Sequence, residues 1–281
     1  MDDERPQHTS EENHDEKEHE QAEERAAISA TVVHEAILRE GEDELKRPTS
    51  ALIWSALAAG LSMGFSMVAE GLIQSMLPDA AWRPLLSKFG YSVGFLIVIL
   101  GRQQLFTENT LTVILPLLQR REGACLKNVA RLWAVVLVAN VVGALIFAWV
   151  LGGTDVFDAN MRATFAEMGH KALNGNFGTM VLRGIFAGWL IALMVWLLPF
   201  AGETRVLVII ILTFLVGLGH FPHIIAGSTE VLYLVIISAA SWKDYFIGFM
   251  IPALIGNVLG GVMLVAMLNH AQVVAGNGQD V

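Results

Sequence analysis

The sequence predicts an all-α integral membrane protein, a six-span bundle with broken second and fifth helices and an inverted 3+3 repeat. Three observations lead to this prediction. The chain has 281 residues with 54% hydrophobic content, too apolar for a soluble domain of that size. Six apolar runs are long enough to cross a bilayer, and polar residues interrupt two of them. A short asparagine motif recurs in the third and sixth runs.

The first 48 residues differ in composition from the rest of the chain. They hold 16 acidic against 6 basic residues, whereas the other 233 hold 11 acidic against 12 basic. We expect residues 1–48 to form an acidic cytoplasmic tail on a nearly neutral apolar body. The only dense charge cluster is negative, which argues against a nucleic-acid partner.

The tail contains one segment with helical periodicity. Residues 1–24 lack the basic region and apolar core of a signal peptide, so the first span is expected to act as an uncleaved insertion signal. Further on, Ile28, Val32, Ala36 and Ile37 recur at helical spacing. This pattern predicts a short interfacial helix that ends before Pro48, although a tail helix without a special role fits equally well.

A membrane domain is expected over residues 49–270, followed by a short tail over 271–281. Its four uninterrupted apolar runs cover residues 51–77, 132–151, 177–200 and 246–268. Two further runs are broken: residues 91–118 by the segment GRQQLFTENT, and residues 206–240 by HFPH. Half-length apolar pieces around a polar break are typical of discontinuous membrane helices.

The repeat relates the two halves of this domain. Asn140 and Asn257 each begin an N-V-x-G motif, 34 residues after Phe106 and 36 residues after Phe221. Two halves of three spans must be inverted relative to each other, because three is odd. Basic residues near the span ends, mainly in residues 119–133, favour cytoplasmic positions for both termini.

Both breaks can carry binding chemistry. Each starts a new half-helix, whose first N–H groups lack intrahelical partners and can attract an anion. We expect Thr107 or Asn109 to cap the first of these helices. His223 lies in the second break, where an imidazole can share a proton with a weak acid.

Other polar groups near the breaks are interpreted as structural. Arg102 and Glu108 flank the first break and are expected to pair, bracing the loop together with Gln104 and Asn109. His220 and His223 have H-x-x-H spacing, but no third ligand is in view, so no metal or other cofactor is expected. The single Cys125 excludes an internal disulfide.

These motifs resemble the formate/nitrite transporter family. The resemblance rests on LFTEN in a broken second span, a histidine in a broken fifth span and the paired asparagine motifs, and it covers residues 45–270. It implies an aquaporin-like fold in a bacterial inner membrane. It further implies a homopentamer with one pore per protomer, passing small monovalent anions such as formate and nitrite.

The resemblance also implies roles for individual residues. The implied pore residues are Tyr91, Phe95, Leu105, Phe106, Thr107, Phe221 and His223. In the family, the aromatic of the first loop narrows the pore, the threonine binds substrate and the histidine is central.

The chain departs from the family pattern at several positions. Pro222 and Gln104 stand where acidic residues are common, and Gly188 and Gly227 where asparagines are common. The family's lysine near the fourth span is matched only approximately, by Lys171. These departures leave the fold and the transport class in place and the substrate open.

The function expected is a channel or transporter for small monovalent anions of weak acids, with a proton link through the central histidine. A neutral-solute channel for water, glycerol or hydrogen sulfide is the alternative, although the aquaporin NPA pair is absent. A non-conducting structural or sensory protein is a second alternative. Nothing in the sequence resembles a nucleophile paired with a base, so an enzyme is not expected.

Overall fold

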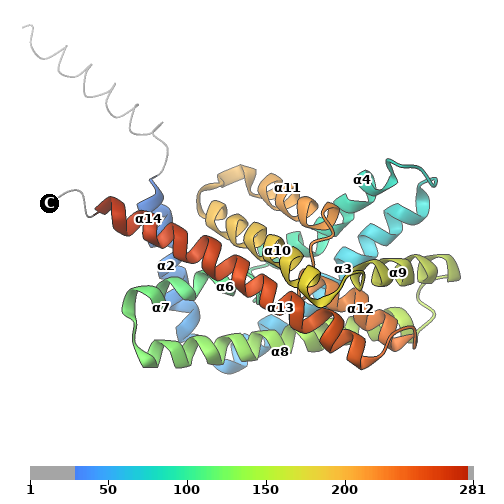
Figure 1. The fold of residues 1–281 in the computed structure, drawn as a ribbon, viewed down its shortest axis with the longest axis horizontal. Helices are drawn as coiled ribbons and strands as arrows, with labels where there is room; N and C mark the ends of the chain where they lie inside the picture. Colours follow the sequence, from blue (N-terminus) through green and yellow to red (C-terminus); the bar gives the residue numbers. More distant parts are fainter. Residues whose placement is uncertain (1–28, 278–281) are drawn as a thin grey trace, which may run out of the picture.

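The computed structural model describes residues 29–277, which fold entirely into helices and their connections, without a β-strand in that range (Figure 1). The main helices are α2 (Ala30–Lys46), α3 (Thr49–Met76), α4 (Arg83–Ser87), α5 (Ser92–Leu100), α6 (Asn109–Thr112), α7 (Ile114–Arg120), α8 (Gly123–Gly153), α9 (Ala159–Ala172), α10 (Phe177–Leu197), α11 (Arg205–Leu218), α12 (Ala226–Ile236), α13 (Ile251–Val258) and α14 (Leu268–Asn277). The π-helical segments η4 (Asp244–Met250) and η5 (Leu259–Met267) flank α13 and continue it. Short 3₁₀ turns are η1 (Lys88–Tyr91), η2 (Leu198–Phe200) and η3 (Gly202–Thr204).

Five helical stretches are long and apolar enough to cross a membrane. They are Thr49–Met76, Arg83–Leu100, Gly123–Gly153, Phe177–Phe200 and Asp244–Gly276. Four of them match the uninterrupted apolar runs. The remaining one, Arg83–Leu100, begins eight residues before the run recognised in the sequence and ends at the first polar break.

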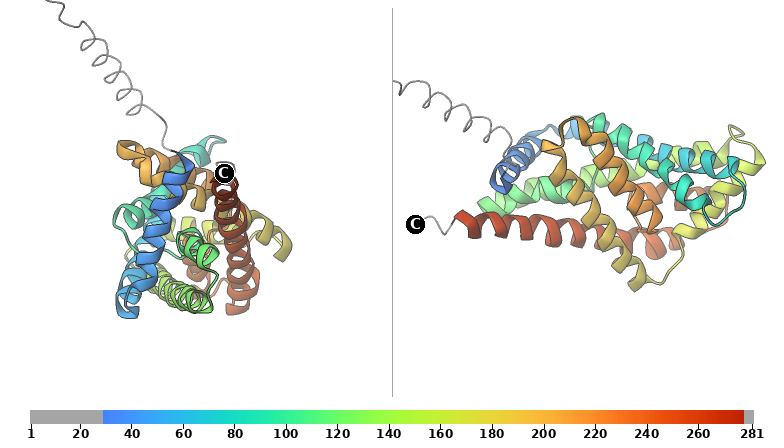
Figure 2. Two further views of the ribbon diagram at one scale, coloured as in Figure 1. Left: turned by 90° about the vertical axis from the view of Figure 1, so that its left-hand side faces the viewer. Right: turned by 90° about the horizontal axis from the view of Figure 1, so that it is seen from above.

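The molecule is elongated, with different elements at its two ends. Helix α2 lies at one end beside the start of α14, and α4 and α9 lie at the other (Figure 1). The same arrangement is seen from above in Figure 2.

Helix α2 covers the segment before Pro48, where a short interfacial helix was predicted. Ser29 caps its start, accepting a hydrogen bond from the backbone N–H of Val32. Ile37 is fully buried, whereas Val32 is half exposed. The helix packs on α6, α7 and α14, and these contacts select the buried face.

Both polar breaks have the same backbone course. Arg102 and His220 have positive φ values of 50° and 49°. The following N–H groups, of Gln103 and Phe221, bond to carbonyl oxygens five residues earlier at 2.9 and 3.0 Å. The chain therefore leaves α5 and α11 through the same left-handed turn.

Glycines allow the long helices of each half to cross closely. Gly60 on α3 lies against the backbone of Asn140 on α8, and Gly188 on α10 lies against the backbone of Asn257 on α13. A Cβ at either glycine would overlap the facing asparagine carbonyl. The glycine at 188, where an asparagine is common in the family, is thus required by this helix crossing.

We predict that Gly188→Ala destabilises the protein by about 1–3 kcal/mol, because overpacking forces the two helices apart. Gly178→Ala on the same helix is the matched control, since its new Cβ would meet nothing closer than 3.5 Å. Thermal unfolding of the purified variants in detergent measures both effects. Equal midpoints for the two variants would contradict the close crossing.

Candidate functional site

Asn140 on α8 holds the first break in place. Its Oδ1 accepts a hydrogen bond from the backbone N–H of Phe106 at 2.9 Å. Its Nδ2 donates to the carbonyl oxygens of Gln104 at 2.9 Å and Ala56 at 2.7 Å. One buried side chain thereby satisfies a donor and an acceptor of the loop and attaches the loop to α3.

Asn257 makes the equivalent bonds at the second break. Its Oδ1 accepts from the backbone N–H of Ile224 at 2.9 Å. Its Nδ2 donates to the carbonyl oxygens of Pro222 at 2.8 Å and Gly184 at 2.9 Å. Ile224, rather than Phe221, is therefore the counterpart of Phe106, because backbone hydrogen bonds and not aromatic character set the repeat register.

The two breaks meet at Thr107 and His223. The Thr107 Oγ1 and His223 Nε2 atoms lie 2.7 Å apart, and both side chains are buried. On its other side, His223 Nδ1 accepts a hydrogen bond from the backbone N–H of Ala226 at 3.2 Å. This bond places the ring proton on Nε2, so His223 donates to the Thr107 oxygen.

This geometry leaves the Thr107 hydroxyl hydrogen free to donate. Its oxygen accepts from His223, and the structure gives the hydroxyl no acceptor among residues 29–277. The predicted cap by Thr107 or Asn109 is wrong, because α6 starts without a side-chain cap. Thr107 instead reaches His223, and Asn109 reaches Gln104.

Apolar side chains surround this contact. The Phe95 ring meets the His223 ring edge-on at 4.9 Å, and Tyr91 packs on Phe95 at 5.4 Å. Leu105 is fully buried in the same core. Of the other two predicted pore residues, Phe106 packs against Trp133 at 5.7 Å and Phe221 stacks on Phe186 at 5.2 Å.

Cavities approach the centre from both ends. The larger, of about 490 Å³, is lined by Glu40, Glu44 and Arg47 of the α2 end together with first-break residues such as Gln104 and Glu108. The smaller, of about 40 Å³, is lined by Tyr91, Lys171, Phe221 and Glu230 and extends to His223.

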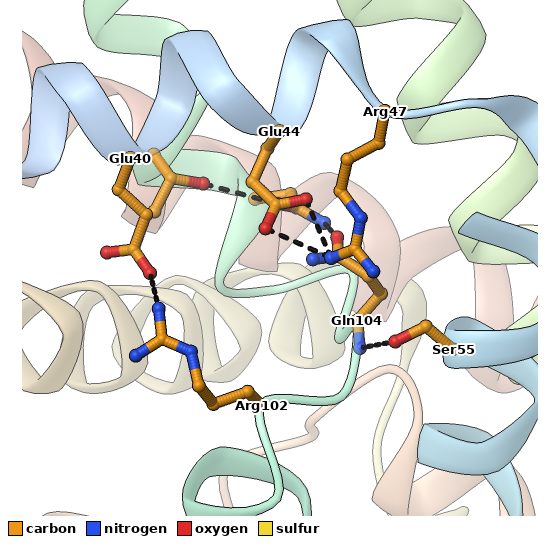
Figure 3. Close-up of polar contacts among 8 residues, drawn as sticks. Glu40, Glu44, Arg47, Ser55, Arg102 and Gln104 are labelled. Carbon is orange, nitrogen blue, oxygen red and sulfur yellow. Dashed lines mark hydrogen bonds and ion pairs between the residues drawn. The ribbon is translucent and has the colours of Figure 1, made fainter. Parts of the chain in front are cut away.

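The first break is held by further hydrogen bonds around Gln104. Its backbone N–H donates to Ser55 Oγ at 3.1 Å (Figure 3), and its Oε1 accepts from Asn109 Nδ2 at 3.1 Å. Trp133 Nε1 donates to the Asn109 carbonyl at 3.1 Å. Gln104 and Asn109 thus make hydrogen bonds within the loop and to the neighbouring helices α3 and α8. Ser55 and Trp133 were not foreseen, because their contacts depend on how α3 and α8 pack.

The predicted pairing of Arg102 with Glu108 is wrong. Arg102 instead forms an ion pair with Glu40 on α2, with Nη2 and Oε1 3.1 Å apart (Figure 3). The left-handed turn at Arg102 directs this side chain away from the bundle centre and towards α2. Glu108 lines the larger cavity, and among the described residues it has no ion-pair partner.

Helix α2 contributes a second ion pair beside the same cavity. Glu44 Oε1 and Oε2 each lie 3.1 Å from Arg47 Nη1. Burial raises the pKa of the Glu44 carboxyl, and the adjacent Arg47 guanidinium opposes that shift. Acidic and basic side chains therefore both line the larger cavity. Within residues 29–277 no group of three His, Cys, Asp or Glu side chains is arranged to hold a metal ion.

Comparisons with known proteins agree on one family. The family model described as formate/nitrite transporter matches residues 31–271. The chain is 43% identical to the inner membrane protein YfdC of Escherichia coli (strain K12), covering 89% of this chain and 81% of that protein. It is 28% identical to the uncharacterized transporter YrhG of Bacillus subtilis (strain 168), covering 84% and 90%.

Solved structures show the same fold. A pentameric formate channel with formate bound matches with a TM-score of 0.68 at 20% identity, covering 80% of this chain and 98% of that chain. An FNT family ion channel matches with a TM-score of 0.69 at 18% identity, covering 86% and 98%. At these identities the likeness concerns the fold.

We predict that Asn140→Ala and Asn257→Ala each destabilise the protein strongly. Each leaves one N–H and two carbonyl groups without their partner, and a buried unsatisfied group costs about 1–3 kcal/mol. Asn160→Ala is the control, since Asn160 is exposed on α9. The measurement is thermal unfolding in detergent. Losses no larger than that of the control would show that the asparagines do not hold the breaks.

Proposed function

The chain belongs to the formate/nitrite transporter family, and we propose that it is a channel or transporter for small monovalent anions of weak acids, such as formate or nitrite. The contact between Thr107 and His223 carries the proposal. It joins the two breaks through a buried polar pair, with the Phe95 ring against His223 and Leu105 in the same apolar core.

The proposed mechanism follows from the direction of the hydrogen bonds. His223 donates to the Thr107 oxygen, and Thr107 donates its own hydrogen to an oxygen of the anion. A hydroxyl that accepts one hydrogen bond becomes a better donor for the next. The pair thus replaces part of the anion's hydration between the cavities.

The proton link follows from the apolar side chains that surround Thr107 and His223. A bare anion loses its hydration there at high cost, whereas the neutral acid loses far less. We therefore propose that lower pH increases flux, because the anion then gains a proton more readily at the site formed by Thr107 and His223.

The membrane architecture proposed is six spans. The stretch α5 to α7 makes a broken second span and the stretch α11 to α12 a broken fifth, which the matched turns and asparagines support. We propose an acidic tail over residues 1–48, a membrane domain over 49–270 and a short tail over 271–281, with both termini cytoplasmic. A bacterial inner membrane and a homopentamer are proposed from YfdC and from the pentameric formate channel, respectively.

We predict that Thr107→Val and His223→Leu each lower formate flux into proteoliposomes at least tenfold and remove its increase at low pH. Both variants keep the bulk of the side chain but lose the hydrogen bond. His170→Leu is the control, because His170 is exposed on α9. A pH-dependent flux that persists in His223→Leu would contradict the proposed site.

The same vesicles test the alternative functions. Current carried by formate or nitrite indicates an anion channel, whereas glycerol or water flux without anion flux indicates a neutral-solute channel. No flux of any of these solutes would indicate a non-conducting protein.

A further inference from the structure

A glycine and an aromatic ring are packed together beside His223. Gly227 follows His223 by one helical turn on α12, and a Cβ at Gly227 would overlap the ring of Phe249, with Cε2 only 2.8 Å away. Phe249 is fully buried. Gly227, Phe249 and His223 all line the smaller cavity. The ring therefore takes the space beside the histidine that a side chain at position 227 would fill.

The Phe249 ring is held in this position by the local fold. Phe249 belongs to the π-helical η4, whose wider turn changes which side chains face α12. Tyr245, one turn earlier on η4, hydrogen-bonds Ser228 Oγ through its hydroxyl at 3.1 Å. This bond ties η4 to α12 at the residue next to Gly227.

The wall next to His223 is consequently aromatic and tight. Tyr91, Phe221 and Phe249 contribute rings to it, and Pro222 adds no side-chain donor. The charged residues Lys88, Lys171 and Glu230 also line this cavity. The volume of this smaller cavity is about 40 Å³. A cavity needs roughly 10–15 Å³ of such volume to hold one water molecule. A compact anion fits that space far better than one with an extended carbon chain.

We propose that Phe249 sets the upper size limit of the anion that reaches Thr107 and His223, and that Gly227 is glycine to admit the ring. This inference rests on the proposed function and narrows its substrate class to formate-sized anions. Phe249 acts as a specificity-determining residue. An asparagine at position 227, which is common in the family, would leave no room for the Phe249 ring.

The test compares formate, acetate and lactate flux in proteoliposomes of the full chain. Phe249→Ala removes the ring, so the ratio of lactate to formate flux is expected to rise at least tenfold. Phe249→Leu should raise the ratio less. Gly227→Ala pushes the ring into the cavity and should lower formate flux at least fivefold, and the double variant Gly227→Ala/Phe249→Ala should recover it.

The matched control is another glycine and phenylalanine pair away from the cavity. Phe165 lies against Gly71, where a Cβ would be 2.6 Å from its Cε1 atom. Phe165→Ala loses similar packing and should leave the lactate-to-formate ratio as in the wild type.

The outcomes separate the two proposals. If Phe249→Ala keeps wild-type formate flux and an unchanged lactate-to-formate ratio, this inference alone is overturned. If the alanine variant fails to fold, an unchanged lactate-to-formate ratio in Phe249→Leu overturns it instead. Failure of the double variant to recover formate flux, with Phe249→Ala active, also counts against it. Absence of formate flux in the wild type overturns the proposed function and this inference together.

Discussion

The structure depends on how two asparagines satisfy non-helical backbone inside an apolar bundle. A backbone group without a partner at membrane depth costs several kcal/mol, so a helix break there needs its own hydrogen bonds. Asn140 and Asn257 each offer one acceptor and two donors, and each uses all three on a break and a neighbouring helix. These bonds fix where the next side chains of each break lie, and thereby bring Thr107 to His223.

The two halves of the domain share these asparagine hydrogen bonds but carry different side chains beside them. The asparagine bonds make Leu105 the counterpart of His223, so one half supplies an apolar side chain where the other supplies an imidazole. Gln104 and Pro222 are counterparts in the same way. The Gln104 N–H needs Ser55 as acceptor, whereas proline has no N–H to satisfy. Pro222 therefore suits the second break, because only its carbonyl is used there.

Hydropathy predicted the helical class and most of the apolar spans, because these depend on local sequence alone. Contacts between distant elements were harder to predict. Arg102 pairs with Glu40 rather than Glu108 because of a left-handed turn and the course of α2. The repeat register moved from Phe221 to Ile224 because backbone bonds define it. The contact of Phe249 with Gly227 depends on a π-helical turn that the sequence pattern does not indicate.

We propose that Thr107 and His223 act on the anion as one hydrogen-bonded unit. A double-mutant cycle on formate flux tests it most directly, using Thr107→Val, His223→Leu and the double variant. We expect strong coupling, with the double variant losing no more flux than the more severe single variant. Losses that multiply, as for two independent sites, would contradict it.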